Sequence, residues 1–584
     1  MTDGSLDISE KIKEVSIAEF FEKNRHLLGY ENPAKSLYTV VKEFVDNSID
    51  ACIEAGILPE IEVRLRRIDE NRYRVRIIDN GPGINPKKLP IALGKFLVGS
   101  KFYRLRQSIG TQGIGAKGAI LYAQLTTSKP ARIYTSTINS DKIYYFELMI
   151  DVRKNEPKII KSAEEENKYK WHGLDVEIEV EGKYSNKIEE YLKFIWLTNS
   201  FAKIIFDKDG EKIVLDRVSD KLPKQPKEIK PHPYGVEFGV FKRFLEITDR
   251  KTLLDFLTKE FSRISLKTAI KILRLSLRGE EIEIKNKEKK VFDILNNFFN
   301  SENVVKAVLE EMNLDSNKKI IDLNEQELRK FFLSYKILEY LYKKPSEITL
   351  QDAEKIFNSM QKVKIRAPPT DCLSQLDNKY LIDALKKLYP AEYYVAITRK
   401  PKVYRGFPFQ IQVAIAYGLK DSSKIEEEDV SDSQSIILRF ANHTPLLYNA
   451  RDCAITKVLM SINWNHYGIS VGKSNLPAEN VLILVDFISV WIPYKSEGKQ
   501  AIAEYPEIIK ELELAIQEAL RKVSIHISKK KRAELVKMKR NVFERYLPEV
   551  AKSIAILANY DEKEIEKKLL EIANKKLPEI KIET

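Results

Sequence analysis

The sequence is poor in cysteine, histidine, methionine and tryptophan. It holds three cysteines in 584 residues, Cys52, Cys372 and Cys453, and they lie far apart. Such usage predicts no disulfide framework, and the six histidines have no paired metal-ligand spacing. We therefore interpret the cysteines as small buried residues in a reducing compartment, and we expect no structural or catalytic zinc.

Long apolar runs are also missing. The longest, such as residues 480–490, fall well short of the roughly 18 residues that a membrane-spanning helix needs. No positively charged and then apolar segment resembling a signal peptide opens the sequence. These features predict a cytoplasmic protein without a membrane partner.

Charge, by contrast, is abundant. The sequence has 98 Lys and Arg against 85 Asp and Glu, which gives a net charge of +13 and a pI near 9.1. This spread-out basic excess is a mild indication of nucleic-acid binding. The high Lys and Glu content, with only three Cys and six Met, is typical of a thermophile.

The first 225 residues predict a mixed α/β sandwich. Residues 6–58 place apolar side chains near the helical period, whereas residues 61–66 and 73–78 alternate as half-buried antiparallel strands do. Further strands are expected at residues 131–151 and 174–180. A Lys- and Pro-rich link at residues 221–233 ends this unit.

The rest of the chain predicts a helical insert, a second α/β unit and a helical tail. Short helices around a turn are expected at residues 235–280, followed by a Lys/Asn/Glu-rich helical elaboration at residues 281–365. Ala367-Pro-Pro-Thr-Asp371 marks the next boundary. Strands are expected at residues 393–398, 409–419, 435–440 and 481–492, with a helix at 449–463. From about residue 500 the pattern is helical, with a break near Pro548.

Glu43 and Asn47 begin the first of three polar motifs, Glu43-Phe-Val-Asp-Asn-Ser-Ile-Asp50. Their spacing places both side chains on one face of a helix. A carboxylate that orients water and an oxygen ligand for Mg²⁺ are what ATP hydrolysis needs. Asp46 and Asp50 are expected to point elsewhere. Taken alone, this spacing is more often a solvated polar helix face.

Asp79 begins the second motif, Asp79-Asn-Gly-Pro-Gly83, at the end of an apolar strand. A buried carboxylate there can accept a hydrogen bond from an adenine amino group. Gly83 and its neighbouring glycine let the backbone approach a base without a clash from a Cβ atom. Taken alone, the motif is more often a plain Asp-Asn-Gly turn.

Gly110-Thr-Gln-Gly-Ile-Gly-Ala-Lys-Gly118 forms the third motif, and its second half matches the dinucleotide pattern GxGxxG. That pattern requires a strand directly before it, whereas here a polar loop at residues 101–108 precedes. We interpret the motif instead as a glycine-rich turn that opens a helix, whose free amides hold phosphates. Lys117 is expected to face the phosphates or solvent. The chain contains no Walker motif.

The order of the three motifs resembles that of the Bergerat-fold, or GHKL, ATPases. The finer resemblance is to the B subunit of type IIB DNA topoisomerases, and it covers residues 15–505. It implies a GHKL α/β sandwich, a helix-two-turn-helix insert, an α/β transducer and a C-terminal helical extension, in a protein of archaeal origin. The segments that carry this resemblance are Phe21–Tyr30, Gly99–Phe102, Pro231–Gly235, Ala367–Leu373 and Tyr494–Ile502.

The resemblance also assigns roles in ATP binding. It implies that Glu43 is the general base, that Asn47 binds Mg²⁺ and that Asp79 recognises adenine. Lys499 would reach the γ-phosphate from the second α/β unit, with Lys495 as the alternative. The remaining positions implied to contact the nucleotide are Gly83, Ser100, Lys101, Gly110, Thr111, Gln112, Gly113, Ile114, Gly115, Ala116 and Lys117. Leu174 stands where many relatives have a threonine beside adenine.

Four domains are expected from the same resemblance. They are an ATPase domain with an N-terminal dimerisation segment (1–228), a helix-two-turn-helix domain with its helical elaboration (229–365), a transducer (366–500) and a helical extension for partner docking (501–584). A basic cluster between residues 521 and 540 has two equally weighted interpretations, a contact with phosphates or an acidic partner, and a solvated helix face.

The function implied is that of the ATP-hydrolysing component of a DNA topoisomerase. ATP-dependent homodimerisation would trap a DNA duplex, and a separate DNA-cleaving A subunit would open a second one, in a heterotetramer of two A and two B chains. The main alternative is a nucleotide-gated DNA clamp of the mismatch-repair type without strand passage. A chaperone shares only the N-terminal motifs, and a histidine kinase would need a phosphoacceptor helix before them.

Overall fold

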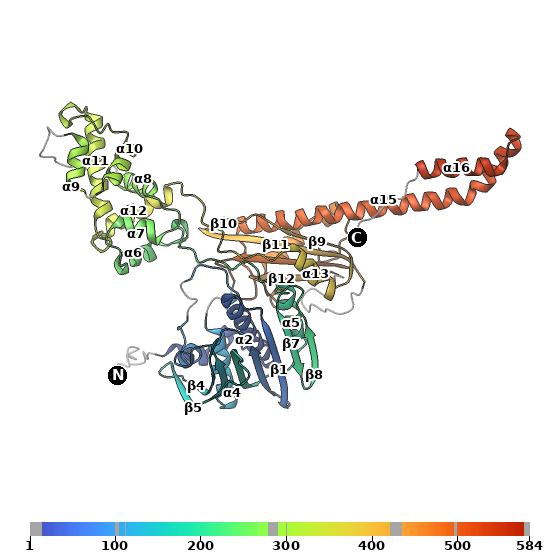
Figure 1. Cartoon of the computed structure of the whole chain (residues 1–584), viewed down its shortest axis with the longest axis horizontal. Helices are drawn as coiled ribbons and strands as arrows, with labels where there is room; N and C mark the ends of the chain where they lie inside the picture. The colour runs from blue at the N-terminus through green and yellow to red at the C-terminus, as the bar shows by residue number, and fades with distance from the viewer. Residues whose placement is uncertain are drawn as a thin grey trace, which may run out of the picture.

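The structure is a computed structural model, and the part of the chain that it describes comprises residues 15–99, 104–110, 113–277, 290–299, 301–420, 435–495 and 499–576. An α/β unit lies below a second α/β unit, a helical domain projects to one side, and a long helix projects to the other (Figure 1). Within these ranges no helix has an apolar stretch that could cross a membrane.

The N-terminal unit is built on an eight-stranded sheet. Its strands are β1 (Glu60–Asp69), β2 (Arg72–Asp79), β3 (Ala131–Ser136), β4 (Lys142–Asp151), β5 (Glu156–Glu166), β6 (Gly173–Glu181), β7 (Lys203–Lys208) and β8 (Glu211–Leu215). Their order is β5-β4-β3-β6-β2-β1-β7-β8. The predicted antiparallel pair β1–β2 is confirmed, and its alternating burial is that of a sheet covered on one face. Strands β5, β7 and β8 were not predicted.

Helices cover one face of this sheet. The helices of the unit are α1 (Ile17–Lys23), η2 (Arg25–Leu28), α2 (Pro33–Ala55), α3 (Leu89–Gly94), α4 (Gly115–Thr127) and α5 (Lys187–Thr198). Helices α2, α3, α4 and α5 contact the strands. The Asn32 side chain caps α2, Pro33 occupies its first turn and Gly56 ends it with a left-handed φ of 71°. The helical stretch predicted at residues 6–58 contains α1, η2 and α2 in its described part.

The helical domain has a core of its own. It comprises η3 (Pro233–Gly235), α6 (Phe238–Ile247), α7 (Leu253–Glu260), α8 (Leu266–Ser276), α9 (Val291–Phe298), α10 (Glu302–Met312), η4 (Ile320–Asp322), α11 (Glu325–Tyr342), η5 (Pro345–Glu347) and α12 (Leu350–Lys362). One apolar cluster includes Phe241, Phe256, Val305, Phe331 and Ile356. The expected elaboration after residue 281 therefore packs with the short helices before it as one body.

The second α/β unit is a mixed sheet buried on both faces. It consists of β9 (Ala391–Thr398), β10 (Lys402–Tyr404), β11 (Phe407–Leu419), β12 (Ile436–Ala441), β13 (Thr444–Pro445) and β14 (Val481–Ser489), with α13 (Asn378–Leu388), η6 (Ala450–Asp452), α14 (Ala454–Ser461) and η7 (Trp464–Tyr467). Helix α13 was not predicted. It packs on β9 and β11 and contacts α5, so it lies between the two sheets.

The final helices form the long projection. Helix α15 (Pro506–Ala558) packs its first half on β9 and β11. The predicted break near Pro548 is wrong, because α15 runs through this residue. Helix α16 (Glu562–Lys576) packs against α15, and Leu547, Ala551 and Ala573 are buried there. This packing holds the helix together where proline removes one hydrogen bond.

The apolar cores show how the units are joined. One cluster extends from the N-terminal sheet and its helices onto one face of the second sheet, including Ala414, Leu438 and Leu484. The other face of the second sheet forms a separate cluster with α14 and α15. Two α/β units that share a core in this way must move against each other by repacking it.

Candidate active site

A cavity of about 620 Å³ lies in the N-terminal unit beside α2 and the start of α4. It brings together residues from all three motifs and from the second α/β unit. The predicted residues that line it are Glu43, Asn47, Asp79, Gly83, Gly110, Gly113, Gly115, Ala116, Lys117 and Lys499. Ile114 lines a smaller adjoining cavity. Ser100, Lys101, Thr111 and Gln112 lie outside the described residues.

Glu43 and Asn47 share one face of α2, as their spacing predicts. The Asn47 Nδ2 atom donates a hydrogen bond to the Glu43 carbonyl oxygen at 2.7 Å, so the amide oxygen is the atom that Asn47 can offer to a cation. The Glu43 carboxylate lies against the first turn of α4, where a Cβ atom on Gly115 would clash with it. Glycine at this position therefore makes room for the carboxylate.

The other two carboxylates of the first motif point elsewhere, as expected. Asp46 pairs with Lys42 and accepts a hydrogen bond from the Tyr191 hydroxyl, both at 2.6 Å. Asp50 accepts hydrogen bonds from the amides of Ile109 and Gly110, at 2.9 and 2.8 Å. The structural role of Asp50 was not predicted: it ties α2 to the segment that precedes the phosphate loop.

Asp79 is buried at the end of β2 and lines the cavity. Its carboxylate accepts hydrogen bonds from the Ser48 hydroxyl at 2.6 Å and from the amides of Gly81 and Leu174 at 2.9 and 3.0 Å. Burial raises the pKa of Asp79 above its ordinary value, although these three donors oppose the rise. The carboxylate is thereby fixed in one orientation at the cavity wall.

Gly83 lines the cavity, as expected, and also has a packing role that was not predicted. Its φ is +68°, and a Cβ atom there would clash with the Ser136 carbonyl oxygen on β3. The glycine is thus needed for close packing of the chain itself. The contacts of the Ser48 hydroxyl and the Leu174 amide with Asp79 were not predicted either. The position of Ser48 inside the first motif was the signal for its role.

The third motif opens α4 at the cavity, as predicted. Gly113 has a left-handed φ of +62°, so a residue with a side chain would be strained there. Among the described residues before α4, the last strand is β2, so rejection of the dinucleotide pattern is confirmed. The first turn of α4 leaves backbone amides without helical partners beside the cavity.

Lys117 lies in this first turn and is buried, so the alternative that it faces solvent is wrong. Its ammonium group donates a hydrogen bond to the Val98 carbonyl oxygen. Burial lowers the pKa of Lys117 to about 8. The residue lines the cavity, and a bound anion would favour its charged form.

Lys499 reaches the same cavity from the second α/β unit. Its backbone has a φ of +53°, which is uncommon for a residue with a side chain. Lys495, the alternative, pairs instead with Glu504 at 3.1 Å and does not line the cavity. The cavity therefore spans the boundary between the two α/β units.

The donor set of the cavity fits magnesium better than a transition metal. In the described ranges, no group of three His, Cys, Asp or Glu side chains could hold a metal ion. Mg²⁺ typically takes one or two protein oxygens and completes its shell with water and phosphate oxygens. Asn47, with its amide oxygen beside the cavity, fits such a site.

These features define an ATPase of the GHKL class. A family model described as "Histidine kinase-, DNA gyrase B-, and HSP90-like ATPase" matches residues 32–148. A second family model, for the transducer of the topoisomerase VI B subunit, matches residues 368–539. The first match contains the Glu43, Asp79 and glycine-rich motifs, and the second contains Lys499.

Relatives with similarity over nearly the whole chain are more specific. The chain is 37% identical over 569 residues to the B subunit of type 2 DNA topoisomerase 6 from Archaeoglobus fulgidus, covering 96% of this chain and 82% of the relative. It is 36% identical over 593 residues to the protein of the same name from Pyrococcus horikoshii, covering 99% and 98%. The chain belongs to the family of topoisomerase 6 B subunits, so it is the ATP-binding and ATP-hydrolysing component of a type II DNA topoisomerase. The clamp alternative is not favoured.

Proposed function

We propose that this chain binds ATP with Mg²⁺ in the 620 Å³ cavity and uses ATP hydrolysis to control passage of one DNA duplex through another. The observation that carries the proposal is the composition of the cavity wall. A carboxylate, an amide oxygen, a buried aspartate and a helix N-terminus come from one α/β unit. Lys499 comes from the other.

Nucleotide recognition is divided between the two ends of the cavity. Asp79 is held by Ser48 and Leu174, so its carboxylate is oriented to accept a hydrogen bond from the adenine amino group. The first turn of α4 presents backbone amides and Lys117 to the phosphates. Asn47 would hold Mg²⁺, which when bound offsets the charge of the phosphates.

Glu43 acts as the general base in this proposal. Its carboxylate lies beside the first turn of α4, where it can orient a water molecule and accept its proton. Lys499 contributes positive charge from the second α/β unit. Phosphoryl transfer depends mainly on positioning and charge stabilisation. A lysine from the second unit therefore makes catalysis depend on the relative position of the two α/β units.

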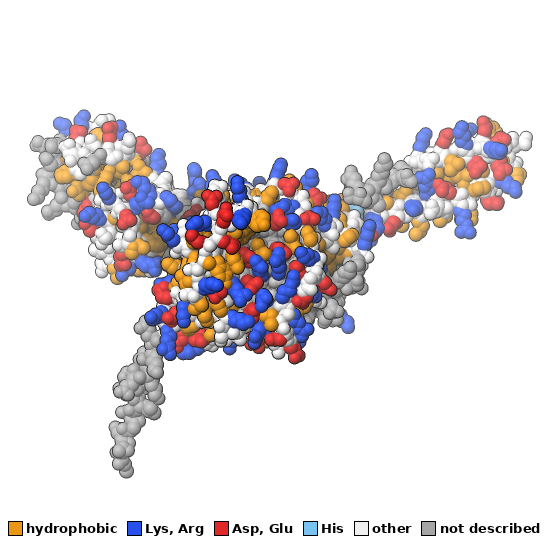
Figure 2. Space-filling model, turned by 60° about the horizontal axis from the view of Figure 1, so that its bottom comes forward, with side chains coloured by type: hydrophobic (Ala, Val, Ile, Leu, Met, Phe, Trp, Pro, Cys, Tyr) orange, Lys and Arg blue, Asp and Glu red, His pale blue; other side chains and the backbone are white. Residues whose placement is uncertain are grey.

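The partners proposed are a DNA-cleaving A subunit, a second copy of this chain and double-stranded DNA. The N-terminal segment assigned to dimerisation begins in residues 1–14, which lie outside the described residues. The docking surface for the DNA-cleaving partner would lie on the projecting half of α15 and on α16. Apolar side chains gather along this arm (Figure 2). They include Leu535, Met538, Val542, Tyr546, Ile556 and Leu557.

The decisive test is reconstitution. The tagged chain would be used to capture partners from its native extract, and the eluate would be assayed for unlinking of catenated DNA circles with and without ATP. We expect ATP-dependent unlinking and a second protein component in the eluate. ATP hydrolysis and dimerisation without unlinking, and without a DNA-cleaving partner, would favour the clamp instead.

A Glu43→Gln variant provides the matched control, because glutamine keeps the size of the side chain but cannot accept the proton. We expect this variant to bind ATP and the partner while hydrolysis falls by roughly 10²- to 10⁴-fold. A loss of ATP binding, measured by calorimetry, would assign Glu43 to binding and not to catalysis.

A further inference from the structure

The segment before the phosphate loop, residues 104–110, lies between α2 and the second α/β unit. On the α2 side, Asp50 accepts the amides of Ile109 and Gly110. Gly110 lines the ATP cavity. The position of this segment therefore sets one wall of the cavity.

The contact on the other side comes from the turn between β12 and β13. Asn442 and His443 both have left-handed φ values, 49° and 67°. The Asn442 Nδ2 atom donates to the Ser108 carbonyl oxygen at 3.0 Å and to the Ser489 carbonyl oxygen at 2.8 Å. The Ser489 amide donates back to the Asn442 Oδ1 atom at 2.8 Å. Asn and His adopt this backbone conformation more readily than other non-glycine residues, so both suit a turn of this shape.

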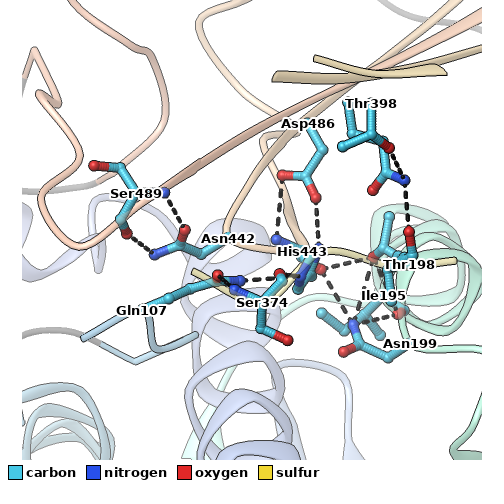
Figure 3. A network of polar contacts seen from close by, with 12 residues as sticks. Gln107, Ile195, Thr198, Asn199, Ser374, Thr398, Asn442, His443, Asp486 and Ser489 are labelled. Atoms are coloured by element: carbon cyan, nitrogen blue, oxygen red, sulfur yellow. Dashed lines mark hydrogen bonds and ion pairs between the residues drawn. The ribbon is translucent and has the colours of Figure 1, made fainter. Parts of the chain in front are cut away.

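His443 forms the centre of the contact (Figure 3). Its Nδ1 atom lies 2.5 Å from an Asp486 carboxylate oxygen on β14. Its Nε2 atom lies 2.9 Å from the Ser374 carbonyl oxygen and 3.0 Å from the Gln107 side-chain nitrogen. The Gln107 side-chain oxygen accepts the Ser374 amide at 2.5 Å. The exposed fractions of Gln107, His443 and Asp486 are 6%, 4% and 1%.

The same turn is anchored to α5. The His443 carbonyl oxygen accepts hydrogen bonds from the Thr198 hydroxyl at 2.7 Å and from the Asn199 side chain at 3.2 Å. Apolar side chains alone would be enough to hold two units together. Buried polar groups contribute little net stability to such a junction unless all of them are paired. Here one histidine instead joins three parts of the junction: the loop segment, the second sheet and α5.

We propose that Gln107, Asn442 and His443 are positioning residues for ATP hydrolysis: through them the second α/β unit holds residues 107–110, and with them the phosphate side of the cavity. The proposal rests on the assignment of the ATP cavity and deepens it. Lys499 would then not be the only link by which the second unit acts on the nucleotide. A shift of the turn at Asn442–His443 would move Gly110 directly.

The charge of His443 fits this role. Burial alone would lower the pKa of His443, but Asp486, the Ser374 carbonyl oxygen and the more distant Asp50 outweigh it, so the pKa is raised. A protonated ring donates to both Asp486 and Ser374. A ring that has lost its Nε2 proton can no longer donate to Ser374 and can instead accept from Gln107.

The test compares full-length Gln107→Ala and Gln107→Glu variants with the unmodified chain. The glutamate can still accept the Ser374 amide with one oxygen and the His443 Nε2 proton with the other. Val523→Ala serves as the control, because it opens a cavity in the buried core under α15, away from the loop segment. Thermal unfolding identifies any variant that fails to fold.

Two readouts are measured on each variant. Hydrogen exchange without nucleotide reports on the Ile109 and Gly110 amides, and steady-state ATPase kinetics separate kcat from KM. For Gln107→Ala we expect at least about tenfold faster exchange and a kcat lowered by roughly 10- to 100-fold with KM nearly unchanged. Gln107→Glu should restore both.

Unchanged exchange in Gln107→Ala, or a kcat no lower than that of Val523→Ala, would overturn the proposal. Faster exchange with a normal kcat would overturn it as well, because the contact would then be structural only. An unmodified chain that binds no ATP would refute the cavity assignment. Intact ATP binding with no effect of Gln107→Ala would refute the positioning role alone.

Discussion

The second α/β unit is joined to the ATPase unit and to the helical domain in different ways. Toward the ATPase unit it shares a continuous apolar core, a buried polar junction around His443 and a cavity wall that includes Lys499. The helical domain keeps a separate core. The chain segments that enter and leave it lie together, with the His232 ring 3.0 Å from the Arg366 carbonyl oxygen.

The two connections determine which parts of the chain can respond to nucleotide binding. The second unit shares close-packed side chains with the ATPase unit, so a rearrangement of the ATPase core near the cavity would displace it. The helical domain is connected through a narrow pair of chain segments, so its orientation can change without repacking the ATPase core. Four experiments test this difference.

The largest effect is expected from Gly115→Ala. The added Cβ atom would displace the Glu43 carboxylate, the flexible end of a side chain, so the fold should survive while the base is misplaced. We expect kcat to fall by roughly 10²- to 10⁴-fold, as for loss of a general base. In a Glu43→Ala background the same change should add little, which a double-mutant cycle would measure. Additive losses would show that Gly115 serves the phosphates and not Glu43.

Lys499→Ala tests the junction directly. Lys499 lines the cavity, and if it stabilises the reacting phosphate as proposed, removal of its charge should lower kcat by roughly 10²- to 10³-fold. Lys495→Ala is the matched control, because Lys495 forms an exposed pair with Glu504 and such pairs contribute little. Stopped-flow and steady-state ATPase assays would compare the two. Equal, small effects would remove Lys499 from catalysis.

The lowered pKa of Lys117 predicts that ATP affinity depends on pH, through a group that belongs to the ATPase unit alone. Because burial lowers its pKa to about 8, the side chain loses its charge as pH rises through that value. Anionic phosphates favour the charged form, so ATP affinity should fall above pH 8, by at most about tenfold per pH unit. Calorimetry from pH 7 to 10 would show this slope, and Lys117→Met should flatten it. A slope that persists in the variant would belong to another group.

The smallest effect is expected from removal of the helical domain. The Tyr234 hydroxyl donates to the Val363 carbonyl oxygen at 2.6 Å, so a short Gly/Ser linker can replace residues 238–362 without straining the ends. ATP hydrolysis should stay within about threefold of that of the full chain, because sites with no shared partners act independently. A loss as large as that of Lys499→Ala would contradict the separation of the two regions.

The sequence predicted strands best where burial leaves a clear pattern, either alternating or continuous. Strands β1 and β2 alternate because helices cover one face only, and β14 was found as an apolar run because all of it is buried. Strand β5 was missed because its last residues are exposed and rich in Lys and Glu. A helix break at Pro548 was predicted wrongly because α15 packs against α16 there, and the local sequence does not reveal such a tertiary contact.

In the candidate site, too, local patterns could be predicted and contacts between distant segments could not. Glu43 and Asn47 could be placed together from helical spacing alone, since both lie on α2. No local pattern brings Lys499 into the same cavity as Glu43 across more than 450 residues, so only the family resemblance predicted that Lys499 belongs to the site. Family membership is now supported over nearly the whole chain, whereas the residue roles stay predictions. The part played by Asp50 and His443 depends on three segments that meet only in the folded chain.

Helix α15 has a mechanical consequence. Its 53 residues form one continuous rod rooted on the second sheet, with its outer half projecting away from it. At 1.5 Å per residue the rod is about 80 Å long, so a tilt of about 5° at its root would sweep its tip through about 7 Å. A rod of this length would therefore act as a lever arm: a small rotation of the sheet at its root would become a displacement as large as a side chain at the far end.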